Sequence, residues 1–304
     1  MENVTLQVIL AQLINGIAIG SIYGLLTTGL NLLLVVCGVW HYAYPYVVVF
    51  SMYLAWLVHR NTGNIALTLL TAFIAGIAIS LITEPLFRPL SKKSEGAPIG
   101  TFILSTGILV ILADLMNNVF IRLGFTAGSV VGFPQIAGNS LIQFGLSSLT
   151  YGQAIMVIGT VISVALLFYL LYRTKLGKSF RAVSQDRVAA QLLGIPTLKT
   201  RLNAFTVAGV LGGMSSVFLI IALAQASATI SDYLAIKVFA IALFAGVGNL
   251  PGGLICGLFF GVFESFLVSF LPGESGAVWG NAIAFILILA TVLFRPRGIF
   301  GSRV

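Results

Sequence analysis

The sequence predicts an all-α membrane protein, a polytopic bundle of about eight to ten transmembrane helices. Of its 304 residues, 59% are hydrophobic and 8% are charged, whereas soluble domains carry about 25% charged residues. So few charges could not cover the surface of a water-soluble protein of this length. Lys and Arg are clustered between long apolar runs, as is typical of cytoplasmic loops. The net charge of +8 therefore indicates membrane topology, and we expect no nucleic-acid partner.

The spans follow from the apolar runs, because a bilayer core about 30 Å thick needs about 20 apolar residues per helix. The runs cover 6–37, 42–59, 65–87, 98–122, 151–172, 202–222, 234–248, 252–271 and 279–295. The first is long enough for one span plus a buried broken piece, or for two short spans. The turn at 246–253 is either a cytoplasmic hairpin or a re-entrant break, since irregular backbone at membrane depth needs protein or water around it.

The basic clusters give the expected orientation. They include Arg88, Lys92 and Lys93, then the segment 173–201, then Arg295, Arg297 and Arg303. With these clusters inside, the C-terminus is cytoplasmic, nine spans place the N-terminus outside, and 125–150 is external. That external stretch is either a plain loop or a lid facing a partner. We expect a single transmembrane domain over 1–304, and the sequence contains no phosphate-binding GxxxxGK[ST] pattern.

The segment 173–201 holds seven of the sixteen Lys and Arg and, within it, a short punctuated helix. Asp186 suits an N-cap, because its carboxylate accepts from the free N–H groups of a first turn. Gly194 suits the left-handed residue past a last turn, and Pro196 prevents the helix from continuing. The helix is then about 10 Å long. An isolated helix this short is marginal in water, so a partner is expected to hold it.

Polar residues within the apolar runs are expected to face protein or water, because a mid-bilayer charge costs about 2.5–3.5 kcal/mol. Asp114 and Glu264 have either a packing role or a role in a cavity or gate. Lys237 lies where its ammonium could snorkel to the outer interface. Glu84 and Arg88 form an i,i+4 ion pair. Three amides are expected to bond between helices: Asn15, Asn31 and Gln225.

The glycines and cysteines say less about function than the charged residues do. Gly253, Gly257 and Gly261 recur at four-residue spacing, which lets helix backbones approach closely. Cys37 and Cys256 are the two cysteines, and both lie in apolar runs with no metal-ligand spacing. The sequence therefore predicts no metal site, no cofactor and no catalytic residue.

Four stretches together resemble one family of transport proteins. They are "NGIAIGSIYGLLTTGLNLLL", "RAVSQDRVAAQLLGI", "AIALFAGVGNLPGGLICGLFFGVFES" and "AIAFILILATVLFRPRGIFG", beginning at residues 15, 181, 240 and 282. The chain resembles the permease subunits of branched-chain amino acid ABC importers, a family that also includes urea and amide permeases. The resemblance runs nearly from end to end.

The resemblance implies that the short helix is a coupling helix, which docks on a cytoplasmic ATPase. Ala189, Ala190 and Gly194 match the spacing of the permease motif EAA-x-x-x-G, with Val188 in place of the Glu. Arg187 stands where a Pro often follows the Asp. The coupling residues implied are Arg181, Asp186, Ala189, Ala190 and Gly194.

The resemblance also implies a translocation path near the end of the first helix. The family's stretch Asn-Phe-Ala-His-Gly is replaced here by residues that include His41, Tyr42 and Tyr44. These larger groups would make a narrower or differently shaped passage. The candidate path residues are Asn31, His41, Tyr42, Tyr44, Asp114 and Glu264.

The function implied is that of an inner-membrane permease subunit in a bacterial or archaeal ATP-driven importer. Its partners would be a second permease subunit, with which it forms a heterodimer, two cytoplasmic ATPase subunits and an external substrate-binding protein. The solute would be a branched-chain or related amino acid, with urea or short amides as alternatives. An ion-coupled secondary transporter or channel is a further alternative, favoured by Asp114, Glu264 and the broken helices. An intramembrane enzyme is the third class, and paired catalytic groups for it are lacking in the sequence.

Overall fold

A computed structural model describes residues 2–90, 97–124, 129–135, 141–144 and 147–270, with scattered positions between 279 and 301. Seven helices within these residues are long and apolar enough to cross a membrane. They match seven of the nine predicted runs. The run 42–59 corresponds to α2 (Tyr44–Thr62), which is helical but ends in the polar turn His59–Thr62. The run 279–295 lies mostly outside the described residues.

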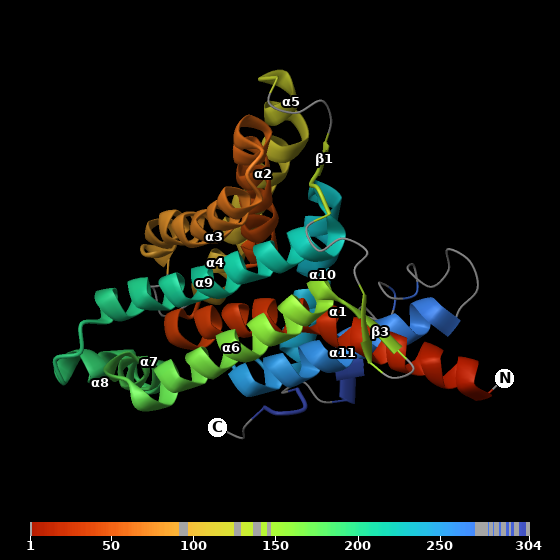
Figure 1. Ribbon diagram of the computed structural model, residues 1–304. Coiled ribbons are helices and arrows are strands. Elements are labelled where there is room, and N and C mark those ends of the chain that lie inside the picture. The colour runs from red at the N-terminus through yellow and green to blue at the C-terminus, as the bar shows by residue number, and fades with distance from the viewer. Residues whose placement is uncertain are drawn as a thin grey trace.

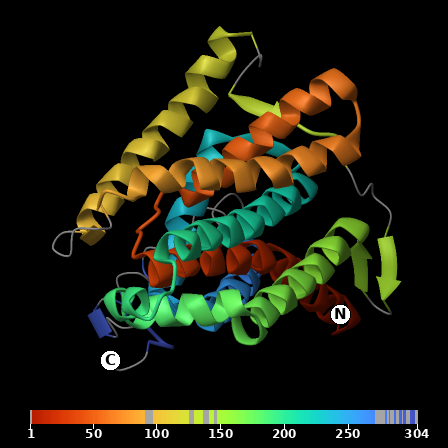
Figure 2. The ribbon, with the colours of Figure 1, turned by 90° about the vertical axis from the view of Figure 1, so that its left-hand side faces the viewer.

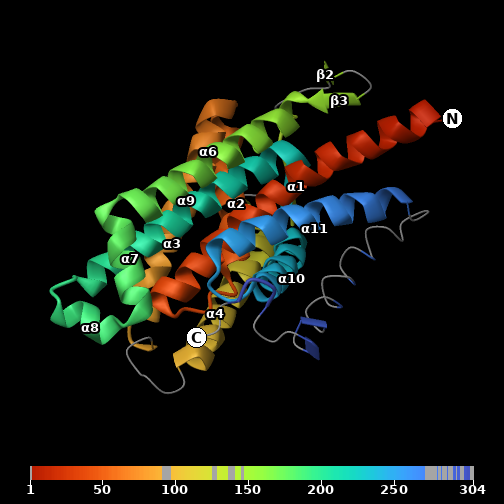
Figure 3. The same cartoon turned by 90° about the horizontal axis from the view of Figure 1, so that it is seen from below.

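The helix α1 (Glu2–Cys37) is the centre of the bundle (Figure 1). It is one unbroken helix of 36 residues, so both expectations for the first run, a span with a broken piece and two short spans, are wrong. It is buried through most of its length and packs against α11 (Leu250–Phe270), α9 (Thr197–Leu223) and α6 (Tyr151–Arg173). Figure 3 shows α6, α9, α1 and α11 running side by side.

The contact between α1 and α11 is made by glycines, as the four-residue spacing predicts. A Cβ on Gly20 would lie 2.8 Å from Cα of Leu258, and one on Gly257 would meet the backbone of Gly24. Gly261 meets Gly20 in the same way. The two helix backbones therefore touch directly, which only residues without side chains allow.

A second glycine contact joins α3 (Ile65–Phe87) to α9. A Cβ on Gly76 would lie 2.7 Å from Cα of Gly213, and one on Gly209 would lie 2.8 Å from Cα of Ile77. The first half of α2 is buried against these helices, and the Tyr44 hydroxyl donates to the Ala208 carbonyl at 2.7 Å. Figure 2 shows α4 (Ala97–Asp114) at the outer edge of the bundle. It continues into the π-helix η2 (Leu115–Val119) and the short α5 (Phe120–Arg122).

The turn between α10 (Ala228–Ala245) and α11 is a tight hairpin. Gly248 has a φ of +79°, and the Asn31 amide donates to the Asn249 carbonyl and accepts from the Gly248 N–H. Leu250, which begins α11, lines the same cavity as Arg181. The turn therefore lies at the end of the bundle that carries the basic segment, which favours the hairpin over the re-entrant break.

The predicted external stretch contains short strands that the helical expectation did not include. The strand β1 (Val130–Gly132) pairs antiparallel with β4 (Gln225–Ser227), so that Val130 faces Ser227. The strand β2 (Leu141–Phe144) pairs with β3 (Ser147–Thr150), which leads into α6. Thr150 begins α6 with a capping box shared with Gln153. These strands lie at the end of the bundle opposite α7 (Lys175–Gln185) and α8 (Arg187–Leu192) (Figures 1 and 3).

The glycine contact predicts that Gly257→Leu destabilises the protein by at least about 1–3 kcal/mol, the usual cost of overpacking. The added side chain would have to displace the backbone of Gly24. The measurement is thermal unfolding in detergent, followed with a thiol-reactive dye at the buried Cys37 and Cys256.

Gly107→Leu is the matched control, because a Cβ at Gly107 would have no neighbour within 4 Å. We expect this variant to unfold at or above the wild-type temperature, since leucine favours helix over glycine. Equal unfolding temperatures for the two variants would contradict the packing assigned to Gly257.

Candidate functional site

The basic segment contains two consecutive helices, where the sequence analysis identified one. The first, α7, begins after Thr174, whose side chain accepts from the Gly177 N–H at 3.3 Å. It buries Gly177, Phe180 and Val183 and leaves its basic side chains on the outside. The signal for α7 was present in the spacing of Phe180 and Val183 on one helical face. Gly177 is required because a Cβ there would collide with the Leu171 carbonyl.

The second helix, α8, has the predicted punctuation. The Asp186 carboxylate accepts from the N–H groups of Val188 and Ala189 at 2.8 and 3.0 Å, so the N-cap is confirmed. Gly194 has a φ of +79°, which confirms the left-handed stop. The N–H groups of Gly194 and Ile195 then bond back to the last turn. Both ends of a six-residue helix are thereby satisfied within the chain.

The outer face of α8 is apolar and uncovered by the residues that the structure describes. Leu192 is 84% exposed, Leu193 is 81% exposed and Val188 is also exposed. Ala190 points the other way and is buried, and Ala189 is half-buried. Large apolar side chains so exposed at the end of a molecule mark an interaction surface. We call this set, Val188, Leu192 and Leu193, the α8 tip.

The segment is connected to the bundle through a buried carboxylate. Glu84 of α3 is inaccessible to solvent and accepts from Arg88 and Arg201, each at 2.7 Å. The Glu84–Arg88 pair was predicted, whereas Arg201, at the start of α9, was not. Two guanidinium groups satisfy a carboxylate that would otherwise be costly to bury. The Glu84–Arg201 pair thereby fixes the start of α9, the helix that follows α8.

A second, largely buried ion pair holds α10 against α11. The Lys237 ammonium lies 2.5 Å from Glu264, and the Tyr23 hydroxyl of α1 donates to the same carboxylate at 2.8 Å. Lys237 also donates to Tyr23 at 3.1 Å. The expectation that Lys237 snorkels is therefore wrong, because its partner lies inside the bundle. Because the Lys237 ammonium is paired with Glu264 inside the bundle, it does not have to extend to the membrane interface.

The remaining candidate path residues are placed in different surroundings. His41 is buried, 3.2 Å from the Ser105 hydroxyl, with its ring 6.1 Å from that of Tyr44. Tyr42 is half-buried between the rings of Phe102 and Phe239, at 5.5 and 5.0 Å. The structure thus brings His41 and Tyr44 together. The rings of Tyr42, Phe102 and Phe239 form an aromatic cluster next to them.

Asn31 and Asp114 lie apart from that group. Asn31 is buried and holds the α10–α11 turn. Asp114 is exposed at the end of α4, where it accepts from the Asn118 amide at 2.7 Å. Glu264 belongs to the separate cluster with Lys237. Among the described residues there is no group of three potential metal ligands.

The architecture defines a class of protein. Long apolar helices with paired internal charges form a multi-pass membrane protein. A short capped helix with an apolar tip projects from one end, as in a transport subunit that works with a partner.

The chain belongs to the family of permease components of branched-chain amino acid transport systems, whose model matches residues 12–292. It is 29% identical over 281 residues to the probable branched-chain amino acid transport permease protein LivH of Methanocaldococcus jannaschii, covering 91% of this chain and 88% of that one. It is 26% identical to the high-affinity branched-chain amino acid transport system permease protein BraD of Pseudomonas aeruginosa, covering 96% and 95%.

A solved structure has the same fold. PsaBC from Streptococcus pneumoniae in complex with Fab superimposes with a TM-score of 0.51 at 14% identity, covering 93% of this chain and 91% of that chain. The resemblance stated from the four sequence stretches is thus confirmed. The chain is a multi-pass permease of the cell membrane with the fold of ABC importer permeases.

The Lys237–Glu264 pair predicts a strongly non-additive mutant cycle. Lys237→Met leaves Glu264 as an uncompensated charge and is expected to cost about 3–5 kcal/mol. The double variant Lys237→Met/Glu264→Leu removes both charges and is expected to recover most of that loss. The measurement is the unfolding free energy of the full chain in mixed micelles. Additive effects of the two single substitutions would show that the pair contributes no coupling.

Proposed function

We propose that the chain is the membrane-spanning permease subunit of an ATP-driven importer for branched-chain amino acids. It would form one half of the translocation path as a single domain over 1–304. The observation that carries the proposal is the combination of the family match over 12–292 with the apolar tip of α8. The permease relatives LivH and BraD are both named for branched-chain amino acids, which supports this solute over urea or short amides.

In this proposal the α8 tip docks in a groove of a cytoplasmic ATPase subunit. Asp186 and Gly194 fix the ends of α8, Ala189 and Ala190 form its inward side, and Arg181 belongs to the supporting helix α7. ATP hydrolysis occurs on that partner, and a push on α8 passes to the bundle through the Glu84–Arg201 pair. The basic side chains support a cytoplasmic location for this end. The N-terminus then lies outside.

The second permease subunit covers α4 in the proposed complex. Within the described chain α4 packs chiefly against α2, and its outward side chains include Val110, Ile111 and Asp114. A carboxylate facing lipid is costly, so Asp114 requires protein or water next to it. We propose that the path runs along this face, past Asp114 and the half-buried Tyr42. His41 and Tyr44 then shape the wall from behind, while Asn31 and Glu264 hold together the helices α1, α10 and α11 that support it.

The experiment on function reconstitutes the chain with its second permease, ATPases and binding protein in proteoliposomes. We expect uptake of radiolabelled leucine to require ATP and to be reduced by excess isoleucine or valine. Excess urea or acetamide should leave the uptake unchanged. Uptake by the isolated chain along an ion gradient would instead identify a secondary transporter. Competition by urea would overturn the proposed solute and leave the importer class intact.

The α8 tip predicts that Leu192→Arg abolishes ATPase association and ATP-dependent uptake. An arginine there removes apolar contact and places a charge in an apolar groove, while the exposed site leaves the fold unstrained. Association is measured by co-purification of the ATPase with the membrane-inserted chain. Leu123→Arg is the matched control, because Leu123 is 61% exposed at the opposite end. Retained association in Leu192→Arg would count against docking at α8.

The interface on α4 is tested with a photo-crosslinking amino acid at position 110. We expect an adduct with the second permease subunit, because Val110 is exposed one turn before Asp114. The same amino acid at Ile158 of α6, also exposed, is the control and should react with lipid alone. An adduct with the second permease at 158 and none at 110 would move the interface to α6.

A further inference from the structure

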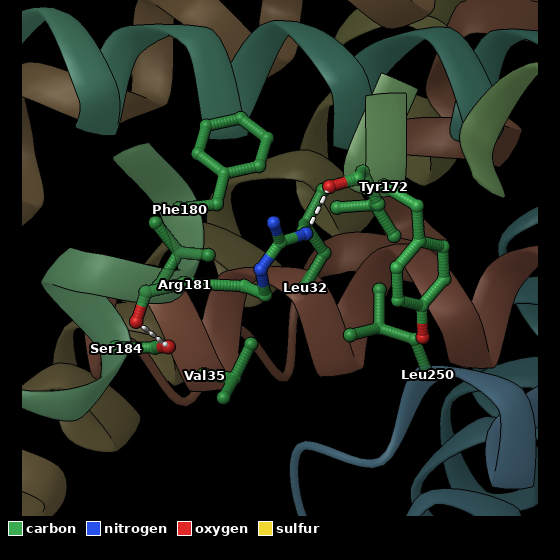
Figure 4. A pocket seen from close by; sticks show the side chains of 9 residues that line it. Leu32, Val35, Tyr172, Phe180, Arg181, Ser184 and Leu250 are labelled. Atoms are coloured by element: carbon green, nitrogen blue, oxygen red, sulfur yellow. Dashed lines mark hydrogen bonds between the residues drawn. The ribbon is translucent and has the colours of Figure 1, made fainter. Parts of the chain in front are cut away.

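A cavity of about 210 Å³ lies at the basic end of the bundle (Figure 4). Its wall is apolar and comes from helices far apart in the sequence: Leu32, Val35 and Val36 of α1, with Leu171 of α6 and Leu250 of α11. Arg181 and Ser184 of α7 contribute its polar groups. Among the described residues that line it, none is a carboxylate or a usual metal ligand. The cavity is distinct from the α8 tip and from the proposed path.

The Arg181 side chain is held in place at this cavity. Its guanidinium donates to the Leu171 carbonyl and lies over the Tyr172 ring, 5.7 Å from the ring centroid. Figure 4 shows the guanidinium reaching across the cavity from α7 toward the end of α6. A guanidinium has five N–H donors, and the bond to Leu171 uses one nitrogen of the group. A fixed cation at an apolar wall can bind an anionic group with its remaining donors.

The surroundings are strongly basic. The segment 173–201 contains seven Lys and Arg and one carboxylate, Asp186, which is engaged in capping α8. The Glu84 carboxylate neutralises Arg201. The remaining cations raise the local concentration of anions at this end of the molecule.

The location corresponds to a membrane boundary. The apolar helix α1 ends at Cys37 and α6 ends at Arg173, next to the cavity. Tyr172, Arg181 and Ser184 are exposed, so the cavity opens at the surface. A soluble anion would gain nothing from the apolar wall, whereas a phospholipid presents an anionic head and an acyl chain together. Basic pockets between transmembrane helices on the cytoplasmic side bind such lipids.

A second cavity provides an internal comparison. It measures about 270 Å³ and lies between α3, α6 and α9, with Ser163 as its polar residue among apolar neighbours such as Phe73 and Met214. Acyl chains could enter both cavities, but the second has no cation to select a headgroup. Of these two cavities, the one with Arg181 should therefore determine headgroup selectivity.

We propose that the Arg181 cavity binds one anionic phospholipid of the inner leaflet. The phosphate would lie on Arg181, and the part of an acyl chain nearest the headgroup would lie against α1. The bound lipid would join α7 to α1, α6 and α11 and so steady the platform that carries α8. The assignment to the inner leaflet rests on the proposed orientation of the permease. The binding of an anionic phospholipid in the cavity does not depend on that orientation.

The experiment uses the full chain in nanodiscs of phosphatidylcholine with one quarter phosphatidylglycerol, then counts retained lipids by native mass spectrometry. The wild type is expected to retain one phosphatidylglycerol in preference to phosphatidylcholine. Arg181→Gln should lower that preference about five-fold, the effect of one basic residue near an anionic headgroup. Lys178→Gln is the matched control, because it removes the same charge from α7 outside the cavity, and it should stay within about two-fold of wild type.

Val36→Phe tests the cavity without changing any charge. Its larger side chain projects from α1 into the space for the acyl chain and should reduce retained phosphatidylglycerol. Equal retention of both lipids by the wild type would overturn the proposal. Equal losses in Arg181→Gln and Lys178→Gln would also overturn it, since they would indicate diffuse attraction to the basic segment. The readout requires neither ATP nor uptake, so its failure is distinguishable from failure of the importer function.

Discussion

The direct backbone contact between α1 and α11 is the constraint on which the rest of the bundle depends. Lipid supplies no hydrophobic force between helices, so close packing has to stabilise their association. Gly20, Gly24, Gly257 and Gly261 provide that packing at the buried centre of the molecule. With α1 fixed against α11, the helices α6, α9 and α10 have a rigid central helix to pack on. The glycine contact between α3 and α9 extends the bundle outward.

In the part of the bundle that the structure describes, the internal charges of Glu84 and Lys237 are paired. Each pair joins helices that would move during the proposed transport cycle. Glu84 joins α3 to the beginning of α9, the helix that follows α8 in the chain. Lys237 and Glu264 join α10 to α11 and engage Tyr23 of α1. Each pair resists separation, because breaking it would leave a charge uncompensated at low dielectric. A displacement of α8 would therefore move α9 and α3 together.

The basic end combines two kinds of surface with different chemistry. The α8 tip is apolar and faces away from the bundle, as a protein partner requires. The Arg181 cavity faces the membrane boundary with an apolar wall and a cation, as a phospholipid requires. In the proposed complex, the same segment contacts the ATPase on one side and the bilayer on the other. Its many cations favour both the cytoplasmic location and the anionic leaflet.

Features that depend on neighbouring residues could be predicted from the sequence. Apolar runs set the positions of the helices, Asp186 and Gly194 set the ends of α8, and glycine spacing indicated the packed face of α11. The tertiary structure alone decided which distant groups meet. Lys237 and Glu264 are 27 positions apart, and Arg201 and Glu84 are 117 apart. Caps and hydropathy act over a few residues, whereas ion pairs and cavities depend on how separate helices cross.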